Sequence, residues 1–244
     1  MILTEPLGHV AILRLDRAAK RNALTPNMLG ALVSALSTAS SARAIVLSGL
    51  GEVFCAGFDL SASQTDDAVL PALLSKLAEA CRALRQAHCP VVCSAHGGAI
   101  AGGCALAAAC DFVFTDDGAK LGYPAVKLGI SPAVSGPHLS AGVGVGAARA
   151  RLLDPLVVSG SEAVRLGLAR QSAPTAGECE AAAIAFATTL AQKPPHAIAY
   201  TKRWLNELDG SDDGQRADAA LEASLSGVGS SEQRELLKAI WSKG

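Results

Sequence analysis

The chain has 244 residues, half of them apolar, and its 21 basic and 22 acidic side chains give a formal net charge of −1. This length and apolar content suffice for a globular core, and the balanced charge, without a long block of either sign, argues against nucleic-acid binding. The seven cysteines form neither a Cys-x-x-Cys pair nor a His/Cys cluster, so we expect reduced, buried thiols and no metal site.

Neither export nor membrane insertion is indicated. Glu5 and Arg14 stand where a signal peptide needs an uninterrupted apolar core. The uncharged stretch over 91–110 contains paired glycines and His96, which favour a turn over a membrane-spanning helix. We therefore expect a cytoplasmic protein without a membrane span.

The first part of the chain repeats a pattern of strand, loop and helix. Extended segments are predicted at 10–15, 44–48 and 53–60, and helices after Thr25-Pro26 and over 66–86. Thr25 is suited to the N-cap of the first helix, and Pro26 is tolerated in its first turn. Alternation of this kind is typical of an α/β fold.

The segment over 91–111 has the most distinctive order of residue types. A β-branched run stops at two glycine pairs, and a row of alanines follows before Asp111. This order predicts a strand, a tight turn and a closely packed helix whose first N–H groups are free to stabilise negative charge. Because GxxxxGK[ST] and an early strand-GxGxxG are both absent, the sequence does not favour a P-loop or a dinucleotide site.

The remaining sequence becomes progressively helical. A strand is predicted at 112–114, a glycine- and proline-rich pocket wall at 122–146, and helices at 147–153, 161–168, 198–208, 215–225 and 235–241. Two capping boxes, Thr175-x-x-Glu178 and Ser230-x-x-Gln233, mark further helix starts. The first two-thirds of the chain is therefore predicted to be α/β and the last third α-helical.

Six short motifs carry the main functional signal. They are Arg17 through Leu24, Phe54-Cys55-Ala56-Gly57-Phe58-Asp59-Leu60, Pro90 through Asp111, Leu121-Gly122-Tyr123-Pro124, Lys127-Leu128-Gly129-Ile130 and Ala163-x-x-Leu166-Gly167-Leu168. In this order the motifs resemble the crotonase superfamily, also called the enoyl-CoA hydratase/isomerase family. The resemblance implies a spiral of ββα units over residues 1–190 and a C-terminal helical region over 191–244 used in trimer contacts. It also implies a homotrimer or a dimer of trimers, which is a hexamer.

The same resemblance implies an acyl-CoA thioester as ligand, with coenzyme A entering as part of the substrate and no tightly bound cofactor. The backbone N–H groups of Phe58 and Gly102 would form an oxyanion hole for the thioester oxygen. The implied substrate-binding neighbours are Ala56, Gly57, Asp59, Leu60 and Gly103. The cations implied for the CoA phosphates are Arg17, Lys20, Arg21 and Lys243.

The chain departs from the family pattern where hydratases carry two glutamates, because Ala105 and Ala125 stand there. Hydration needs one group to activate water and another to supply a proton, each contributing about 10²–10⁴-fold in rate, so we expect standard hydratase activity to be weak or absent. His138, in the pocket-wall segment, is a candidate substitute base. Tyr123 is a candidate for hydrogen-bonding the substrate or for lining the wall.

Three functions remain open at this point. In the first, the chain is a divergent enzyme of the lyase or isomerase class that uses the oxyanion hole with another base or with substrate-assisted chemistry such as decarboxylation or thioester cleavage. In the second, the chain is an ordinary hydratase or isomerase, and the alanines at positions 105 and 125 argue against this alternative. The third alternative is a non-catalytic acyl-CoA-binding or carrier protein of fatty-acid metabolism.

Overall fold

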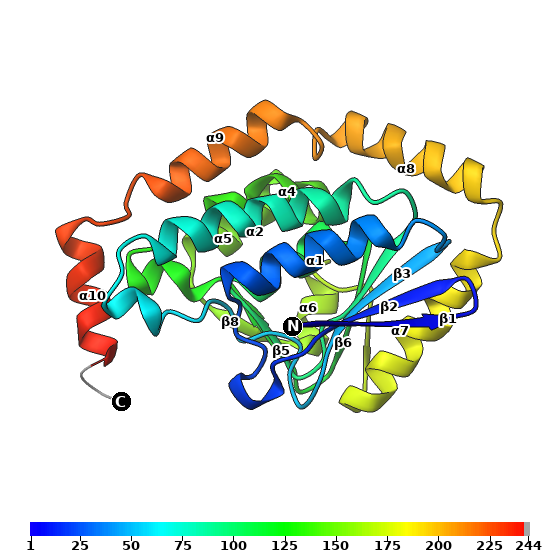
Figure 1. Ribbon diagram of the computed structural model, residues 1–244, viewed down its shortest axis with the longest axis horizontal. Coiled ribbons are helices and arrows are strands. Elements are labelled where there is room, and N and C mark those ends of the chain that lie inside the picture. Colours follow the sequence, from blue (N-terminus) through cyan, green and yellow to red (C-terminus); the bar gives the residue numbers. More distant parts are fainter. Residues whose placement is uncertain (242–244) are drawn as a thin grey trace.

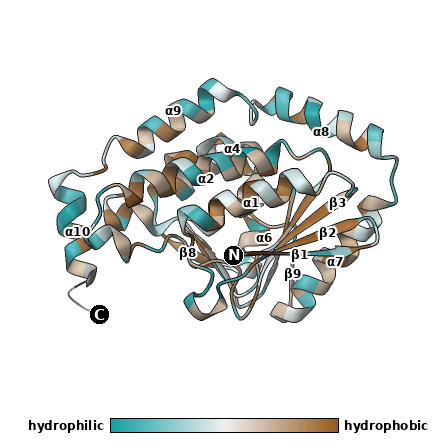
Figure 2. Ribbon diagram, in the orientation of Figure 1, coloured by the Kyte–Doolittle hydropathy of each residue, from teal (hydrophilic) through white to brown (hydrophobic). Residues whose placement is uncertain are grey.

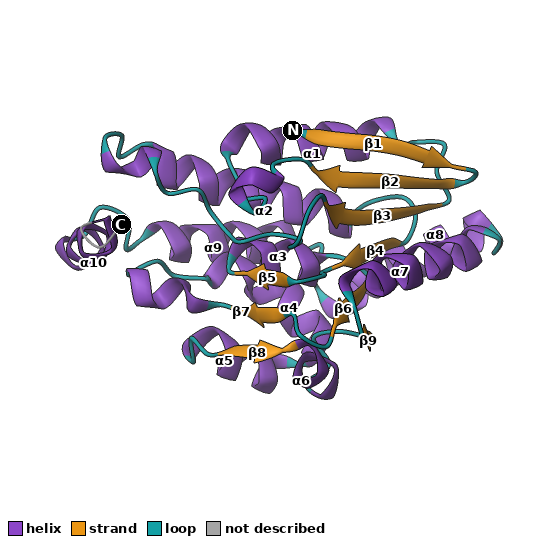
Figure 3. Cartoon of the chain, turned by 90° about the horizontal axis from the view of Figure 1, so that it is seen from below, coloured by secondary structure: helices purple, strands orange, loops and turns teal. Residues whose placement is uncertain are grey.

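The computed structural model describes residues 1–241 and contains a six-stranded sheet (Figure 3). Its strands, in spatial order, are β1 (Ile2–Leu7), β2 (Val10–Leu15), β3 (Ala44–Gly49), β4 (Val91–Ser94), β6 (Phe112–Asp116) and β9 (Gln171–Ala173). β1 and β2 pair in antiparallel orientation, and each later neighbour in the sheet pairs in parallel. Parallel pairs need crossover connections, which helices supply here.

Helices cover both faces of this sheet (Figure 1). One face packs against α1 (Pro26–Thr38), α2 (Val69–Arg85) and α3 (Gly102–Ala109), and the other packs against α7 (Ala176–Ala191). Successive strand residues point to opposite faces, so Leu13 and Leu47 join the first core whereas Ile12 and Val46 join the second. This double burial explains why the central strands are almost wholly apolar.

A smaller sheet lies beside the C-terminal ends of the central strands. It contains β5 (Gly98–Ile100), β7 (Lys120–Gly122) and β8 (Val157–Ser159), with β5 parallel and β8 antiparallel to β7. The connecting helices are α4 (Gly136–Val143), α5 (Val145–Leu153) and α6 (Gly160–Arg165), and 3₁₀ turns occupy Ala18–Lys20, Ala62–Gln64, Pro124–Leu128 and Ala133–Ser135. Because β5 leads through one residue into α3, it fixes the direction from which that helix begins.

The chain ends with α8 (Pro195–Asp209), α9 (Gly214–Leu225) and α10 (Ser231–Trp241), which run along the outside of the molecule (Figure 1). They are more hydrophilic than the strands and α2 (Figure 2). Two buried polar side chains attach α8 to the body: Lys202 Nζ lies 2.7 Å from Asp111 Oδ2, and Asn206 Nδ2 donates to the Arg85 carbonyl. Within residues 1–241, no helix is long and apolar enough to cross a membrane.

Most of the predicted elements are confirmed, and Thr25 Oγ1 accepts the Met28 N–H as the N-cap of α1. Four differences stand out. The strands β1, β5, β7, β8 and β9 are additional to the prediction, and the last four have only three residues each, which carry too little periodicity to detect. Residues 136–143 form a helix inside the predicted pocket wall. The helix predicted over 161–168 is the shorter α6, with Ser159 as its N-cap, and the 53–60 segment forms only isolated bridges at Cys55 and Phe58.

Candidate functional site

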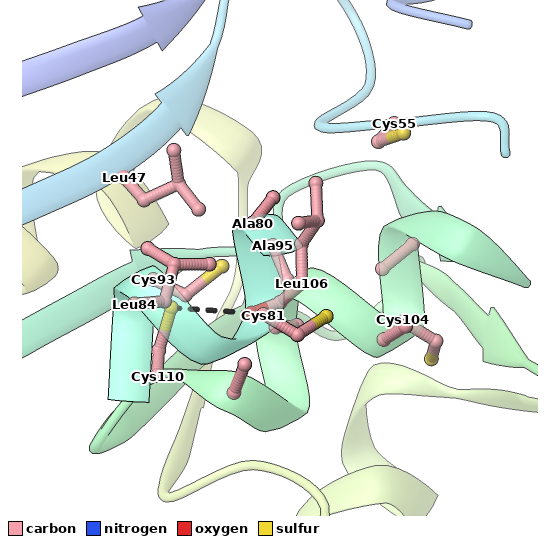
Figure 4. Close-up of a cluster of buried hydrophobic side chains, with 14 of the residues drawn as sticks. Leu47, Cys55, Ala80, Cys81, Leu84, Cys93, Ala95, Cys104, Leu106 and Cys110 are labelled. Carbon is pink, nitrogen blue, oxygen red and sulfur yellow. Dashed lines mark hydrogen bonds between the residues drawn. The ribbon is translucent and has the colours of Figure 1, made fainter. Parts of the chain in front are cut away.

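Two segments that are far apart in the sequence meet beside the start of α3. The Cys55 N–H donates to the Gly98 carbonyl at 3.0 Å, and the Ile100 N–H donates to the Cys55 carbonyl at 3.0 Å. These bonds place the loop that contains Phe58 against the turn that leads to Gly102. Figure 4 shows Cys55 on its separate loop near the helix that carries Cys104 and Leu106.

Glycines permit this close approach. Gly57 has a φ of 94°, a conformation that L side chains rarely adopt. A Cβ atom on Gly103 would lie 2.8 Å from both the Cβ and the carbonyl oxygen of Cys55, so any larger residue would push the segments apart. Ala101, a non-glycine residue, has a φ of 48° immediately before α3. Such strained backbone is concentrated at functional sites in proteins.

The Phe58 and Gly102 N–H groups have no hydrogen-bond partner within the part of the chain that the structure describes. In the bridge between Leu24 and Phe58, the Leu24 N–H donates to the Gly57 carbonyl and the Asp59 N–H donates to the Leu24 carbonyl. The Phe58 N–H takes no part in this bridge. Gly102 is the first residue of α3, where an N–H lacks an intrahelical acceptor. Both residues line one cavity of about 120 Å³.

The lining of this cavity, which we call the thioester cavity, is almost entirely apolar. Besides Phe58 and Gly102 it comprises Ala56, Gly57, Leu60, Leu74, Leu77, Ile100, Ala101, Pro124, Ala125, Leu128, Ile130, Ser131, Pro132, Val134 and Ser135. Two serine hydroxyls are its only polar side-chain groups, and none of these lining residues is ionisable. The cavity therefore offers backbone donors to an oxygen atom without offering a base to water.

The predicted glutamate positions fall differently in the fold. Ala125 lines the thioester cavity, whereas Ala105 is fully buried in the core next to it. Of the predicted substrate-binding neighbours, Ala56, Gly57 and Leu60 line the cavity and Gly103 supports it from behind through its contact with Cys55.

Asp59 is held by its own neighbours and does not line the cavity. Its carboxylate accepts hydrogen bonds from the Ser61 backbone and hydroxyl groups and from the Arg17 guanidinium. These hydrogen bonds, led by that of the Ser61 hydroxyl, keep the pKa of Asp59 below its ordinary value. The side chain is therefore an ionised anchor of the loop.

The predicted phosphate-binding cations are only partly brought together. Arg17 is used internally, since it pairs with Asp59 and donates to the Ala23 carbonyl. Lys20 and Arg21 are exposed on the adjoining turn, and Lys243 lies outside the described residues. The turn depends on Asn22, which sequence reasoning treated only as part of a motif.

Asn22 is fully buried at a φ of 53°, and its side chain bonds three backbone groups. Its amide nitrogen donates to the Leu50 and Val53 carbonyls, and its amide oxygen accepts the Arg17 N–H. Asparagine tolerates this backbone region better than most residues and bonds nearby backbone readily, which is the signal that could have identified it.

His138 and Tyr123 lie away from the two free N–H groups. Both line a second cavity of about 470 Å³ that includes neither Phe58 nor Gly102. The buried Tyr123 hydroxyl donates to the Cys104 carbonyl at 3.2 Å, and burial lowers the pKa of His138 to about 4. The structure therefore does not bring the candidate base together with the predicted oxyanion hole.

All seven cysteines are free and buried, as the sequence predicts. Burial raises the pKa of Cys55 and of Cys104, the two thiols beside the site, to about 12. A thiol is a poor nucleophile without its thiolate, so neither is suited to attack a thioester. Figure 4 shows the other thiols of this core, with Cys110 Sγ bonded to the Leu106 carbonyl at 3.3 Å.

The chain is similar to known proteins over most of its length. The family model described as "Enoyl-CoA hydratase/isomerase" matches residues 6–235. The chain is similar to a putative enoyl-CoA hydratase of Thermus thermophilus, with 34% identity covering 97% of this chain and 96% of that protein. It is also similar to the probable enoyl-CoA hydratase echA6 of Mycobacterium tuberculosis, with 36% identity covering 81% and 79%. An enoyl-CoA hydratase/isomerase structure from Mycobacterium paratuberculosis superposes with a TM-score of 0.87 and 27% identity, covering 98% and 97%.

Proposed function

Because this chain belongs to the enoyl-CoA hydratase/isomerase family, we propose that it binds an acyl-CoA thioester with the carbonyl oxygen between the N–H groups of Phe58 and Gly102. The observation that carries this proposal is the presence of two unpartnered N–H groups on one apolar cavity, among the residues that the structure describes. In such a water-poor site, fixed donors stabilise the charge that a thioester oxygen gains.

We propose further that this protein holds and polarises the thioester without hydrating it at an ordinary rate. Among the residues that the structure describes, the lining contains no carboxylate or imidazole that could activate water or protonate the α-carbon. Since each acid/base group contributes about 10²–10⁴-fold, the absence of both lowers the expected hydration rate by several orders of magnitude. Divergent chemistry in this site is limited to reactions whose substrate supplies its own leaving group or base, such as decarboxylation.

A non-catalytic acyl-CoA-binding or carrier role is the second candidate. The specific observation in its favour is the same apolar lining, because binding an acyl group requires burial of its surface and no proton transfer. In both candidates coenzyme A arrives as part of the ligand, with Lys20 and Arg21 as exposed partners for its phosphates. A homotrimer or a dimer of trimers remains part of the proposal.

Calorimetry with matched ligands tests the binding proposal without altering the protein. We expect butyryl-CoA to bind about tenfold more tightly than its thioether analogue, which lacks the carbonyl oxygen, because two hydrogen bonds are lost. Equal affinity for the two ligands, or no binding of either, would contradict the oxyanion-hole proposal.

Turnover then separates the two roles. Crotonyl-CoA hydration should remain close to the uncatalysed rate, and an ordinary enzymatic turnover would refute that part of the proposal. Mass spectrometry of acyl-CoAs that co-purify with the protein, followed by incubation, identifies a ligand that is either converted or returned unchanged. The variant Ala125→Glu, which places a carboxylate on the cavity lining, should gain some hydratase activity if the thioester is correctly oriented.

A further inference from the structure

The second cavity is large, separate from the thioester cavity and lined by mixed groups. It lies between α2, α3, α4 and the segment after α6, and we call it the α4 cavity. Its lining comprises Arg85, Cys104, Ala107, Ala108, Cys110, Asp111, Phe112, Val113, Leu121, Tyr123, His138, Leu139, Ala141, Gly142, Val143, Gly167, Leu168, Ala169 and Arg170. Polar and apolar groups share this surface, and the buried polar groups among them need an explanation.

Arg85 is a buried cation without a counter-ion. The residue is 8% exposed, and its Nη2 donates to the Ala108 carbonyl at 2.9 Å. Its Nε is buried and has no hydrogen-bond partner, and no carboxylate within residues 1–241 forms an ion pair with its guanidinium. Asp111 lines the same cavity, but its Oδ2 accepts hydrogen bonds from Lys202 and from the Val91 N–H. Buried charges in proteins are normally paired, so this guanidinium requires an anion.

His138 supplies a second unsatisfied group in the same place. The residue is 3% exposed, and its Nδ1 is buried without a partner among the described residues. Burial and the nearby Arg85 keep this imidazole neutral at pH 7, so one ring nitrogen carries a proton and can donate it. Two buried donors therefore belong to one cavity, one on α2 and one on α4.

We propose that the α4 cavity binds the carboxylate of a small organic acid with an apolar body. The carboxylate takes hydrogen bonds from the Arg85 guanidinium and the His138 imidazole, one to each oxygen, and supplies the missing negative charge. The apolar body packs against Ala107, Val143 and Leu168. The buried Arg85 guanidinium matches a single negative charge, because Arg170, the second guanidinium of the lining, is exposed and lies over the rings of Phe112 and Phe186.

This site is independent of the proposed thioester function, because the two cavities share no lining residue. A carboxylate can come from a free acid or from an acidic side chain on a second copy of this chain. The experiment distinguishes these sources by measuring octanoate binding for the free acid and self-association for the second copy. Octanol serves as the uncharged body and inorganic phosphate as the competing anion.

The test is calorimetric titration of octanoate into the full-length protein in a buffer without carboxylates. We expect saturable binding that weakens at least tenfold in Arg85→Met, which keeps the apolar stem and removes the charge, and also weakens in His138→Leu. The matched control is Arg43→Met, the same change at an exposed position outside the cavity. Butyryl-CoA binding should be unchanged in Arg85→Met. This readout separates failure of the carboxylate-site proposal from failure of the thioester-binding proposal.

Several results would overturn the proposal. They are absence of saturable octanoate binding, equal binding of octanol or tighter binding of phosphate in the unaltered protein, and unchanged octanoate binding in Arg85→Met. Loss of self-association in Arg85→Met without any octanoate binding would assign the anion to a second copy and would also refute it. If Arg85→Met fails to fold, the comparison of octanoate with octanol and the His138→Leu variant still decide the outcome.

Discussion

The Arg17 guanidinium lies 2.6 Å from a carboxylate oxygen of Asp59, the residue immediately after Phe58. This pair joins the loop after β2 to the segment that presents one of the two free N–H groups. Arg17 was predicted from the sequence as a partner of the CoA phosphates, and the structure gives its charge a partner inside the protein. Its contribution to ligand binding is therefore expected to act through the position of Phe58.

Replacing Asp59 by asparagine tests this positioning role. The variant Asp59→Asn keeps the shape of the side chain and removes its charge, so the loop should loosen, with about 1 kcal/mol less stability and weaker binding of butyryl-CoA. Arg17→Met should produce a similar loss, and the double variant should lose little more than either single variant. Additive losses in butyryl-CoA affinity would instead show that Arg17 contacts the ligand directly.

The contact between Gly103 and Cys55 gives a second prediction. Gly103→Ala places a Cβ atom within 2.8 Å of the Cys55 backbone, so we expect a loss of about 1–3 kcal/mol in the free energy of unfolding. Binding of butyryl-CoA should weaken as well, because the two N–H groups would move apart. Urea unfolding and calorimetry measure the two effects.

Gly30 is the matched control for that substitution. It lies inside α1, and a Cβ atom there would meet no heavy atom within 4 Å. Gly30→Ala should therefore raise stability by about 0.5–1 kcal/mol through helix propensity, with no change in ligand affinity. If both alanines had the same effect, the close packing of Gly103 would not be what holds the site together.

The sequence predicted the elements that form this site better than it predicted their surroundings. The helix start at Gly102 follows from glycines that end a β-branched run. The pairing of Gly102 with Phe58 was implied by the family resemblance that the order of the motifs carries. The Enoyl-CoA hydratase/isomerase assignment is confirmed by the family match, whereas the oxyanion hole stays a prediction.

The position of His138 could not be predicted from periodicity. It was placed in an irregular pocket wall, but residues 136–143 form α4 and direct the imidazole into a different cavity. Tertiary packing overrides the glycine and proline signals of this segment, since Pro137 is tolerated in the first turn of the helix. The absence of a counter-ion for Arg85 was likewise invisible, because it depends on contacts between distant elements.

Burial of His138 makes stability depend on pH. Its pKa is lowered from 6.5 to about 4 by burial and by Arg85, with Asp209 opposing and Arg82 adding to the shift. Between these values the unfolded chain binds a proton that the folded protein does not, so stability is full above about pH 6.5 and falls as the pH decreases. We expect a loss of about 2 kcal/mol between pH 7 and pH 5 from this group.

Urea unfolding of His138→Leu at pH 7 and pH 5 measures the part of the stability loss that His138 contributes. The variant should lose less stability on acidification than the unaltered protein, whereas His9→Leu, at an exposed position, should leave the pH dependence as it was. The buffer must not contain carboxylates, because the proposed ligand of the α4 cavity has that chemistry. An identical pH slope in His138→Leu would show that folding does not lower the pKa of this imidazole.

The buried pair of Lys202 and Asp111 controls how α8 is attached to the body. Lys202 Nζ also donates to the Leu84 and Cys89 carbonyls, so Lys202→Met leaves a partly buried carboxylate and two carbonyls short of a donor. We expect a cost of about 3–5 kcal/mol in stability.

If residues 191–244 form a helical region separate from 1–190, this cost should appear as detachment of α8, with faster proteolysis near residue 193. The exposed Lys193→Met is the matched control. Cooperative unfolding of the whole chain, with no early cleavage, would argue that the two parts form one folding unit.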